Sequence, residues 1–239
     1  MPFLTARWES LLLLNYACPA DLLAPLVPAG TELDLWQGEA LVSVVGFLFR
    51  DTRLLGVPVP FHRHFEEVNL RFYVRREVGA ETRRAVSFVR EIVPRRAIAT
   101  VARVVYNEPY VAAPMRHTVT LDAETGGTVG YRWRHRGERF ALSASAAGPA
   151  AFAEPGTEAR FITEHYWGYT RQRDGGTLEY RVEHPSWRLW DAHDAVFTGD
   201  ASALYGPALA AVVAGPPRSA FLAVGSEVSV SPGRRVVGA

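Results

Sequence analysis

The sequence has 239 residues with 26 basic and 25 acidic side chains, and its net charge of +1 gives no reason to expect a nucleic-acid partner or an anionic membrane surface. Hydrophobic residues make up 48% and charged residues 21%, which is typical of a soluble globular protein. A single cysteine excludes an internal disulfide framework and a multi-cysteine metal cluster, and no apolar run approaches the roughly 20 residues that cross a bilayer. We therefore expect a soluble cytoplasmic protein, with neither a nucleic-acid nor a membrane partner, folded as one domain over residues 1–239.

Every one of the 26 basic side chains is an arginine. A Schiff base needs an amine that can lose its proton, and arginine keeps its charge in proteins. Lysine-based imine chemistry is therefore excluded for the side chains of this sequence.

Short strands and turns dominate the first half of the chain. We predict a strand at 11–16, a short helix at 19–27, a hairpin of 32–36 with 40–49, a loop at 54–61, and a hairpin of 66–75 with 84–91. Pro94 then begins the clearest helix, which runs to about Tyr106, because proline is well tolerated in a first turn and apolar residues recur at helical spacing.

The second half continues in the same manner. We predict strands at 116–122, 128–136 and 138–144, a helical turn at 157–163, a hairpin of 166–171 with 177–182, a helix at 203–213 and a strand at 221–230. The stretch 146–155, rich in Ala, Gly and Pro, is linker-like but too short to mark a domain boundary. This pattern predicts an α+β domain with a large, mostly antiparallel sheet that is curled into a barrel, with a few helices around it.

The most informative strand places a polar row on one face. Alternation puts Glu67, Asn69, Arg71 and Tyr73 on one side, opposite Val68, Leu70, Phe72 and Val74. A carboxylate, an amide, a guanidinium and a phenol are the groups that a polar pocket uses. The alternative is a sheet with one wet face, on which Glu67 and Arg71 are hydrated.

Arg95 and Arg96 stand at the expected beginning of the 94–106 helix. Backbone N–H groups and the helix dipole already favour an anion there, and arginine adds a two-pronged donor for a carboxylate or phosphate. The alternative is a solvated first turn in which Arg95 pairs with Glu91.

The histidines carry no specific signature. His62, His64 and Glu66 have the spacing of one face of an extended strand, which a metal could use, but no further ligand follows, so we expect no metal site. His165 and His184 each follow a glutamate, and neighbours in a strand point to opposite faces. Glycine-rich phosphate loops and a Gly-x-Ser-x-Gly turn are absent from the sequence, and we expect no cofactor.

Six stretches closely resemble the YqjF-like family of uncharacterised bacterial proteins (domain of unknown function 2071). They are FEEVNLRFYV (65–74), REIVPRRAIA (90–99), YNEPY (106–110), EHYWGY (164–169), YRVEHP (180–185) and GSEV (225–228). These stretches extend from the first third of the chain almost to its end.

More distantly, the first hundred residues resemble acetoacetate decarboxylase. The segment ADLLAPLVP (20–28) is similar to a helix of that enzyme, and Phe65-Glu66-Glu67 is similar to the motif that carries its active-site glutamate. Carried over, Glu67 matches that glutamate, Arg95 matches the Schiff-base lysine and Arg96 its neighbour, while Arg7 is similar to a substrate-carboxylate arginine with the alignment off by about two residues. The resemblance implies a cone-like β-barrel whose interior pocket Glu67 and Arg95 face, within reach of each other. With arginine at both lysine positions, lysine-dependent decarboxylation is not expected.

We therefore expect a pocket for a small molecule, an organic acid or another small anion, bound by Arg95, Arg96, Arg71, Asn69, Tyr73 and Arg7. Glu67 is the candidate acid or base. Two alternatives stay open: a barrel that binds a ligand without catalysis, and a structural module whose interior is filled by side chains. A raised pKa of Glu67 in a closed pocket would favour proton transfer. The sequence leaves open the identity of the ligand and whether the protein forms a homo-oligomer.

Overall fold

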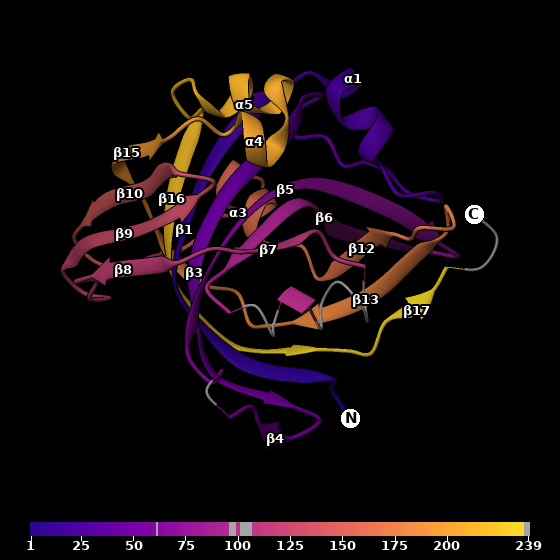
Figure 1. Ribbon diagram of the computed structural model, residues 1–239, viewed down its shortest axis with the longest axis horizontal. Coiled ribbons are helices and arrows are strands. Elements are labelled where there is room, and N and C mark those ends of the chain that lie inside the picture. The colour runs from indigo at the N-terminus through magenta and orange to yellow at the C-terminus, as the bar shows by residue number, and fades with distance from the viewer. Residues whose placement is uncertain (61, 96–98, 101–106, 237–239) are drawn as a thin grey trace.

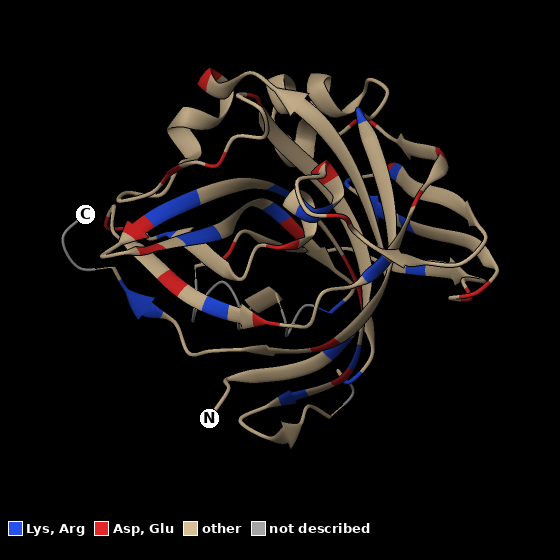
Figure 2. Cartoon of the chain, turned by 180° about the vertical axis from the view of Figure 1, so that it is seen from behind, with Lys and Arg blue, Asp and Glu red and all other residues tan. Residues whose placement is uncertain are grey.

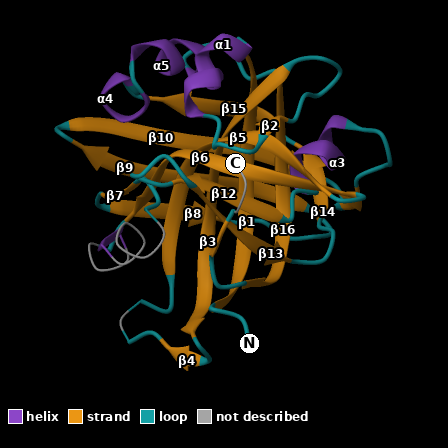
Figure 3. Ribbon diagram, turned by 90° about the vertical axis from the view of Figure 1, so that its right-hand side faces the viewer, coloured by secondary structure: helices purple, strands orange, loops and turns teal. Residues whose placement is uncertain are grey.

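The computed structural model describes residues 1–60, 62–95, 99–100 and 107–236, and strands dominate them (Figure 3). Thirteen strands of the described residues form one sheet: β1 (Leu4–Cys18), β2 (Glu32–Leu33), β3 (Ala40–Leu54), β4 (Val57–Pro58), β5 (Phe65–Val78), β6 (Glu81–Val93), β7 (Tyr110–Ala112), β11 (Ala151–Phe152), β12 (Trp167–Arg171), β13 (Thr177–Glu183), β14 (Arg188–Asp191), β16 (Ser219–Val230) and β17 (Arg234–Arg235). A second sheet has four: β8 (Met115–Val119), β9 (Gly126–His135), β10 (Glu138–Ala147) and β15 (His193–Thr198).

The described helices are short and lie around the sheets. They are α1 (Ala20–Leu23), the 3₁₀ turn η1 (Ala24–Leu26), α3 (Glu158–Thr163), α4 (Ser202–Tyr205) and α5 (Pro207–Val213). In Figure 1, α1, α4 and α5 cover one end of the molecule. None of these described helices is long and apolar enough to cross a membrane.

The path of the large sheet returns toward its beginning. The order β16–β1–β3–β5–β6–β12–β13 runs around the molecule, and β13 pairs with β16 through Val182–Val230 and Glu183–Ser229. The sheet is mixed, because β6 pairs in parallel with both β7 and β12 while the other pairings are antiparallel. The mostly β architecture with few helices that we predicted is therefore confirmed.

The pleat of the large sheet separates two apolar cores. One face of β5 gives Val68, Leu70 and Phe72 to a core shared with the small sheet and with α4 and α5. The other face gives Phe65 and Tyr73 to a core shared with α3 and Trp187. Side chains of one strand alternate between faces, so both cores depend on the register of β5.

Gly46 lets the small sheet approach β3 closely. A Cβ at this position would lie 2.6 Å from the ring of Tyr131 on β9, which is too close for any side chain. The Tyr131 hydroxyl crosses at this point and donates to the backbone oxygen of Ser10, at 2.7 Å. The glycine thus fixes the contact between the two sheets.

Several predicted elements are confirmed and others are corrected. The hairpins β5–β6 and β12–β13 and the β9–β10 pair form as predicted. The predicted hairpin of 32–36 with 40–49 is reduced to the turn at residues 37–38, which the Trp36–Glu39 bridge closes, because β2 pairs with β5 instead of β3. The loop predicted at 54–61 contains β4, which folds back on β3. The short β11 lies in the linker-like stretch, and β14 and β15 were not predicted.

One predicted helix is interrupted, and another lies mostly outside the described residues. The helix at 203–213 is divided into α4 and α5 by Gly206, whose φ of 79° is incompatible with a continuous right-handed helix. Most of the predicted 94–106 helix lies outside the described residues. Within it, Ala99 donates its backbone N–H to the oxygen of Arg95 at 3.2 Å, which is the spacing of a helical turn.

Candidate functional site

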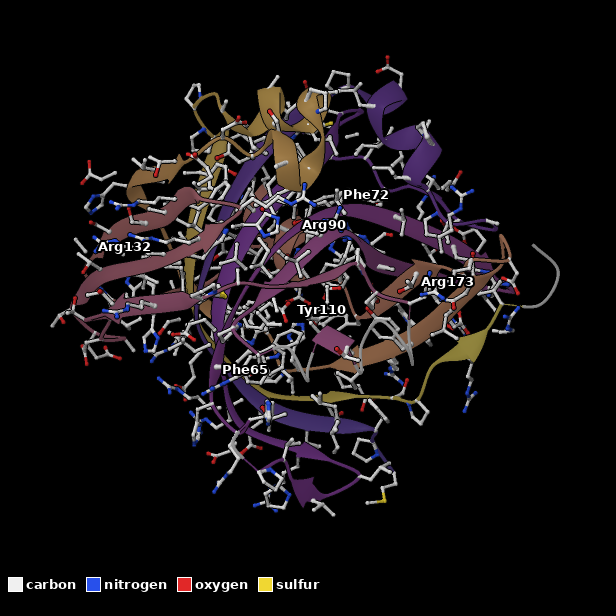
Figure 4. The ribbon with its side chains drawn as sticks, viewed as in Figure 1. Phe65, Phe72, Arg90, Tyr110, Arg132 and Arg173 are labelled. Atoms are coloured by element: carbon white, nitrogen blue, oxygen red, sulfur yellow. The ribbon has the colours of Figure 1, made fainter. Side chains whose placement is uncertain are left out.

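A cavity of about 330 Å³ lies beside the large sheet and is in the size range of small-molecule sites. Its walls are largely aromatic, with Trp8, Phe47, Phe49, Phe65, Phe88, Trp167 and Trp187 among them. The polar lining comes from several strands and includes Glu67, Asn69, Arg71, Glu91, Glu108, Tyr110, Thr163, His165, Tyr180 and His184. Figure 4 shows Tyr110 near the centre of the molecule, with Phe65 below it. A few polar groups within apolar walls are typical of a ligand pocket.

The polar row of β5 faces this cavity. Glu67, Asn69 and Arg71 line it, whereas Val68, Leu70 and Phe72 are buried in the core on the opposite face. The predicted alternation is therefore confirmed for Glu67 and Arg71, and a hydrated outer face is excluded. Tyr73 continues the row but lies behind the cavity, where its hydroxyl shares a 2.6 Å hydrogen bond with Ser43.

Glu67 is buried, with a 3% exposed surface, and has two donors. Asn69 donates from Nδ2 to Oε1 at 3.1 Å, and the Tyr110 hydroxyl donates to Oε2 at 3.0 Å. Burial raises the pKa of Glu67 to about 7, although the bonds from Asn69 and Tyr110 lower it, and the neighbouring Glu108 raises it further. A carboxyl that titrates near neutral pH can both accept and donate a proton there.

Two further buried glutamates join Glu67. Glu91 on β6 lies across from Asn69 on β5 and beside Tyr110 on β7. Glu108, just before β7, accepts hydrogen bonds from the hydroxyls of Thr170 and of Tyr180, the latter at 2.8 Å.

The three carboxyls share one low-dielectric site. Burial raises the pKa of Glu108 to about 7, although the bonds from Thr170 and Tyr180 lower it. Burial, together with Glu108 and Glu67, raises the pKa of Glu91 well above its ordinary value. Like charges close together in a dry site cannot all ionise, so protons are retained among these groups near neutral pH.

Sequence reasoning missed this cluster. It considered Glu91 only as a partner of Arg95 in a solvated turn, but Glu91 is 3% exposed and lines the cavity. The register of the predicted β5–β6 hairpin was the available signal, since Asn69 and Glu91 are direct cross-strand partners. Glu108 and Tyr180 had no local signal, because a parallel pairing and a distant hairpin bring them to this point.

Arg71 lines the cavity, and none of the described acidic side chains pairs with it. Its Nη2 donates to the backbone oxygen of Ile162 at 3.2 Å, and its guanidinium carbon lies 5.5 Å from the centre of the Tyr73 ring. Its Nε is buried with no hydrogen-bond partner, and Arg71 forms no ion pair within the described part of the chain. A buried N–H without an acceptor is costly, so this atom is available to a ligand.

His165 is held by an acidic partner behind the cavity wall. Its Nε2 lies 3.1 Å from the Asp34 carboxylate, which also accepts from Nε of Arg84 at 2.7 Å. Burial lowers the pKa of His165 to about 4, although the bond to Asp34 raises it. Two lone pairs would repel at this distance, so Nε2 carries the proton of a neutral ring.

The other histidines are separate from one another. His62 and His184 line the cavity, and the His184 ring stacks on Trp187 at 4.1 Å. His64 lies outside, where its Nδ1 accepts from the Asp51 backbone N–H. Among the described residues, no group of three or more His, Cys, Asp or Glu has an arrangement that could hold a metal ion.

Of the remaining predicted ligand-binding arginines, the described Arg7 and Arg95 do not line the cavity. Arg7 is half exposed, pairs with Glu9 at 3.1 Å and lines a separate surface depression. Arg95 is exposed and does not line the cavity, so the expected approach to Glu67 is absent and Glu67 bonds Asn69 and Tyr110 instead. The chain leaves the sheet after β6, which directs Arg95 outward. Arg96 lies outside the described residues.

Comparison with known families identifies the family of the chain. The model of the DUF2071 family, whose description reads "Uncharacterized conserved protein", matches residues 5–227. The chain belongs to the DUF2071 family. It is also 28% identical over 190 residues to the "Uncharacterized protein YqjF" of Bacillus subtilis strain 168, a match that covers 77% of this chain and 74% of that protein.

Solved structures show the fold of this DUF2071 protein. Acetoacetate decarboxylase from Legionella pneumophila superposes with a TM-score of 0.66 at 13% identity, covering 99% of this chain and 88% of that one. An acetoacetate decarboxylase-like enzyme from Sphingomonas wittichii gives 0.66 at 14% identity, covering 99% and 94%. The enduracididine biosynthesis enzyme MppR, complexed with a condensation product of pyruvate and imidazole 4-carboxaldehyde, gives 0.65 at 12% identity, covering 98% and 90%. The chain thus has an acetoacetate decarboxylase-like fold.

Proposed function

We propose that this DUF2071 protein binds a small organic acid in the aromatic cavity and transfers a proton to or from it. In this proposal the pairing strands of the large sheet form a cone-like barrel, and the cavity is its interior. One observation carries the proposal: Arg71, which pairs with no described acidic side chain, and Glu67, a carboxyl that titrates near neutral pH, face the same cavity.

Arg71 is the residue that we assign to the carboxylate of the ligand. Its buried Nε has no acceptor among the described residues, and Arg71 is the arginine among the described residues that line the cavity. A carboxylate would supply that acceptor and balance the charge, which buried guanidinium groups require.

Glu67 is the residue that we assign to proton transfer. General acid–base catalysis is most efficient when the catalytic group titrates near the working pH, and burial brings the pKa of Glu67 to about 7. Tyr110 and Asn69 hold both of its oxygens and so orient the carboxyl. Imine chemistry on a side chain is excluded, since the 239 residues contain no lysine.

Replacing Arg71 with methionine is expected to weaken binding of small carboxylates by roughly ten- to a hundredfold, because a charge-assisted hydrogen bond is lost. Titration calorimetry with hexanoate measures this. Arg75→Met is the matched control, since Arg75 lies four residues further along the same row of β5 but is exposed and paired with Glu32. Equal weakening in both variants, or none in Arg71→Met, would exclude Arg71 as the carboxylate site.

A non-catalytic binding module is the second candidate, favoured by the missing lysine and by the outward position of Arg95. Hydrogen–deuterium exchange on a bound keto acid separates the two. Pyruvate is the first probe, because an enzyme of the same fold was solved with a condensation product of pyruvate.

We expect the wild-type protein in D₂O to speed exchange of the pyruvate methyl protons above the uncatalysed background, as followed by NMR. Glu67→Gln removes the proton-transfer group and is expected to return exchange to background, because general acid–base catalysis contributes roughly a hundredfold or more. Glu77→Gln, an exposed position of the same row, serves as the control. Exchange that is unchanged in Glu67→Gln would favour the binding module.

A further inference from the structure

The glutamate end of the cavity has an excess of hydrogen-bond acceptors. Three buried oxygens on residues that line it have no donor within the described structure: Oε2 of Glu91, Oε2 of Glu108 and Oδ1 of Asn69. Because the amide nitrogen of Asn69 donates to Glu67, the amide atom without a partner is the oxygen. Buried acceptors that lack donors are uncommon in folded proteins, and each costs free energy.

The hydroxyl donors that the described residues supply at this end are already in use, and Glu91 and Glu108 lie within hydrogen-bonding reach of each other. Tyr110 donates to Glu67, while Tyr180 and Thr170 donate to Glu108. Within the described part of the chain, none of the three glutamates forms an ion pair. Once these carboxyls have lost their protons, a ligand group that fits here must therefore bring several N–H or O–H donors.

The surroundings favour a cation as that group. Phe47 lies directly across from Glu67 on the neighbouring strand, and Phe65 precedes it on the same face of β5. Aromatic faces and carboxylates together attract an ammonium or guanidinium ion, and burial strengthens both interactions.

We propose that the ligand carries a protonated nitrogen, an ammonium, amidinium or guanidinium group, which is bound by Glu67, Glu91 and Glu108. This inference rests on the proposed function, in which Arg71 binds the carboxylate of the same ligand. The ligand class is then an acid with a basic nitrogen several bonds away, because Glu67 and Arg71 lie four residues apart on one strand, roughly 13 Å at their Cα atoms.

Binding such a cation changes the number of protons that the glutamates hold, and this change can be measured. Near pH 6 the glutamates retain protons, and a cation is held best by carboxylates, so binding releases protons to the buffer. Among the described residues of the cavity wall, the other charged or titratable groups are Arg71, Tyr110 and Tyr180, with His62, His165 and His184 elsewhere on the lining.

Three probes of equal chain length separate the two ends of the site: hexanoate, 6-aminohexanoate and hexylamine. By calorimetry at pH 8, the wild-type protein is expected to bind 6-aminohexanoate roughly ten- to a hundredfold more tightly than hexanoate, as for charge-assisted bonds. At pH 6, the heat of binding 6-aminohexanoate is expected to depend on the ionisation enthalpy of the buffer, which reports proton release. Glu91→Gln is expected to abolish the preference and retain hexanoate binding, whereas the exposed Glu77→Gln changes neither.

The outcomes distinguish the two proposals. Hexanoate binding that depends on Arg71, with no preference for 6-aminohexanoate and no proton release, overturns the nitrogen site alone. Hexylamine binding as tight as that of 6-aminohexanoate supports the nitrogen site and overturns the role of Arg71. Tighter binding of hexanoate than of 6-aminohexanoate by the wild-type protein overturns the nitrogen site without any variant, so the test does not depend on whether Glu91→Gln folds.

Discussion

Replacing Glu67 with glutamine is expected to stabilise the folded protein at pH 8 by about 3 kcal/mol, which is the shift of the Glu67 pKa from 4.5 to about 7 converted at 1.36 kcal/mol per unit. In the unfolded chain the carboxyl loses its proton near pH 4.5, whereas in the folded protein it keeps it up to about pH 7. As the pH rises from 4.5 to about 7, the ionisation of Glu67 therefore favours the unfolded state progressively, and the loss of unfolding free energy is complete above about pH 7. Glutamine has the same shape but no charge to desolvate.

The size of this effect depends on pH in a defined way. Below about pH 4.5 Glu67 is protonated in both states, so the wild-type protein and Glu67→Gln are expected to unfold at the same urea concentration. Urea titrations at pH 4 and pH 8, followed by the fluorescence of the six tryptophans, measure the difference. Glu77→Gln is exposed and is expected to match the wild type at both values. A Glu67→Gln variant that is less stable at pH 8 would contradict the raised pKa. Stabilisation together with lost proton exchange would identify Glu67 as a residue kept for function at the expense of stability.

Replacing Gly168 with alanine is expected to lower the free energy of unfolding by about 2–4 kcal/mol, because Gly168 lies against Tyr180, which donates a hydrogen bond to the glutamate cluster. Gly168 on β12 lies opposite Tyr180 on β13. A Cβ at Gly168 would lie 2.2 Å from Cζ of the Tyr180 ring and 2.6 Å from its hydroxyl oxygen, so the ring must shift. The shift would break the 2.8 Å hydrogen bond from Tyr180 to Glu108 and leave a buried carboxyl with one donor fewer. Overpacking and the lost bond both contribute to the loss.

Gly130→Ala is the matched control for this prediction. Gly130 also lies in a strand, β9, and the nearest atom to a Cβ there would be 3.8 Å away. The unfolding free energy of the Gly130→Ala variant is expected to stay close to that of the wild type. Combining Gly168→Ala with Tyr180→Ala is expected to relieve the steric contact without restoring the hydrogen bond to Glu108. If Gly168→Ala unfolded at the same urea concentration as Gly130→Ala, the close contact with Tyr180 would not be part of the folded protein.

Because surface charges of both signs are mixed, we expect the cavity, and not the surface, to select the ligand. Viewed from behind in Figure 2, acidic and basic residues are interspersed along the strands, as the net charge of +1 implies. Surface ion pairs such as Arg75–Glu32 are solvated and contribute little. The cavity differs, because desolvation there raises the pKa of its carboxyls.

Local pattern alone determined the part of the site that lies on one strand. The period of two placed Glu67, Asn69 and Arg71 on a single face, because successive side chains of a strand alternate whatever the rest of the chain does. The β5–β6 hairpin was predictable for a related reason: its two strands are close in sequence. The absence of lysine likewise excluded imine chemistry on a side chain before any fold was known.

Only the tertiary structure decided which other groups meet that row. Glu108 and Tyr180 are 72 residues apart, and they meet because β6 pairs in parallel with both β7 and β12. The dependence on long-range pairing also explains the wrong prediction for β2, which pairs with β5 and not with the adjacent β3. It also explains Arg95, which the sequence comparison placed beside Glu67 and the fold directs to solvent. Parallel and long-range pairings bring together residues distant in sequence, so neither periodicity nor local spacing contains the information that would predict them.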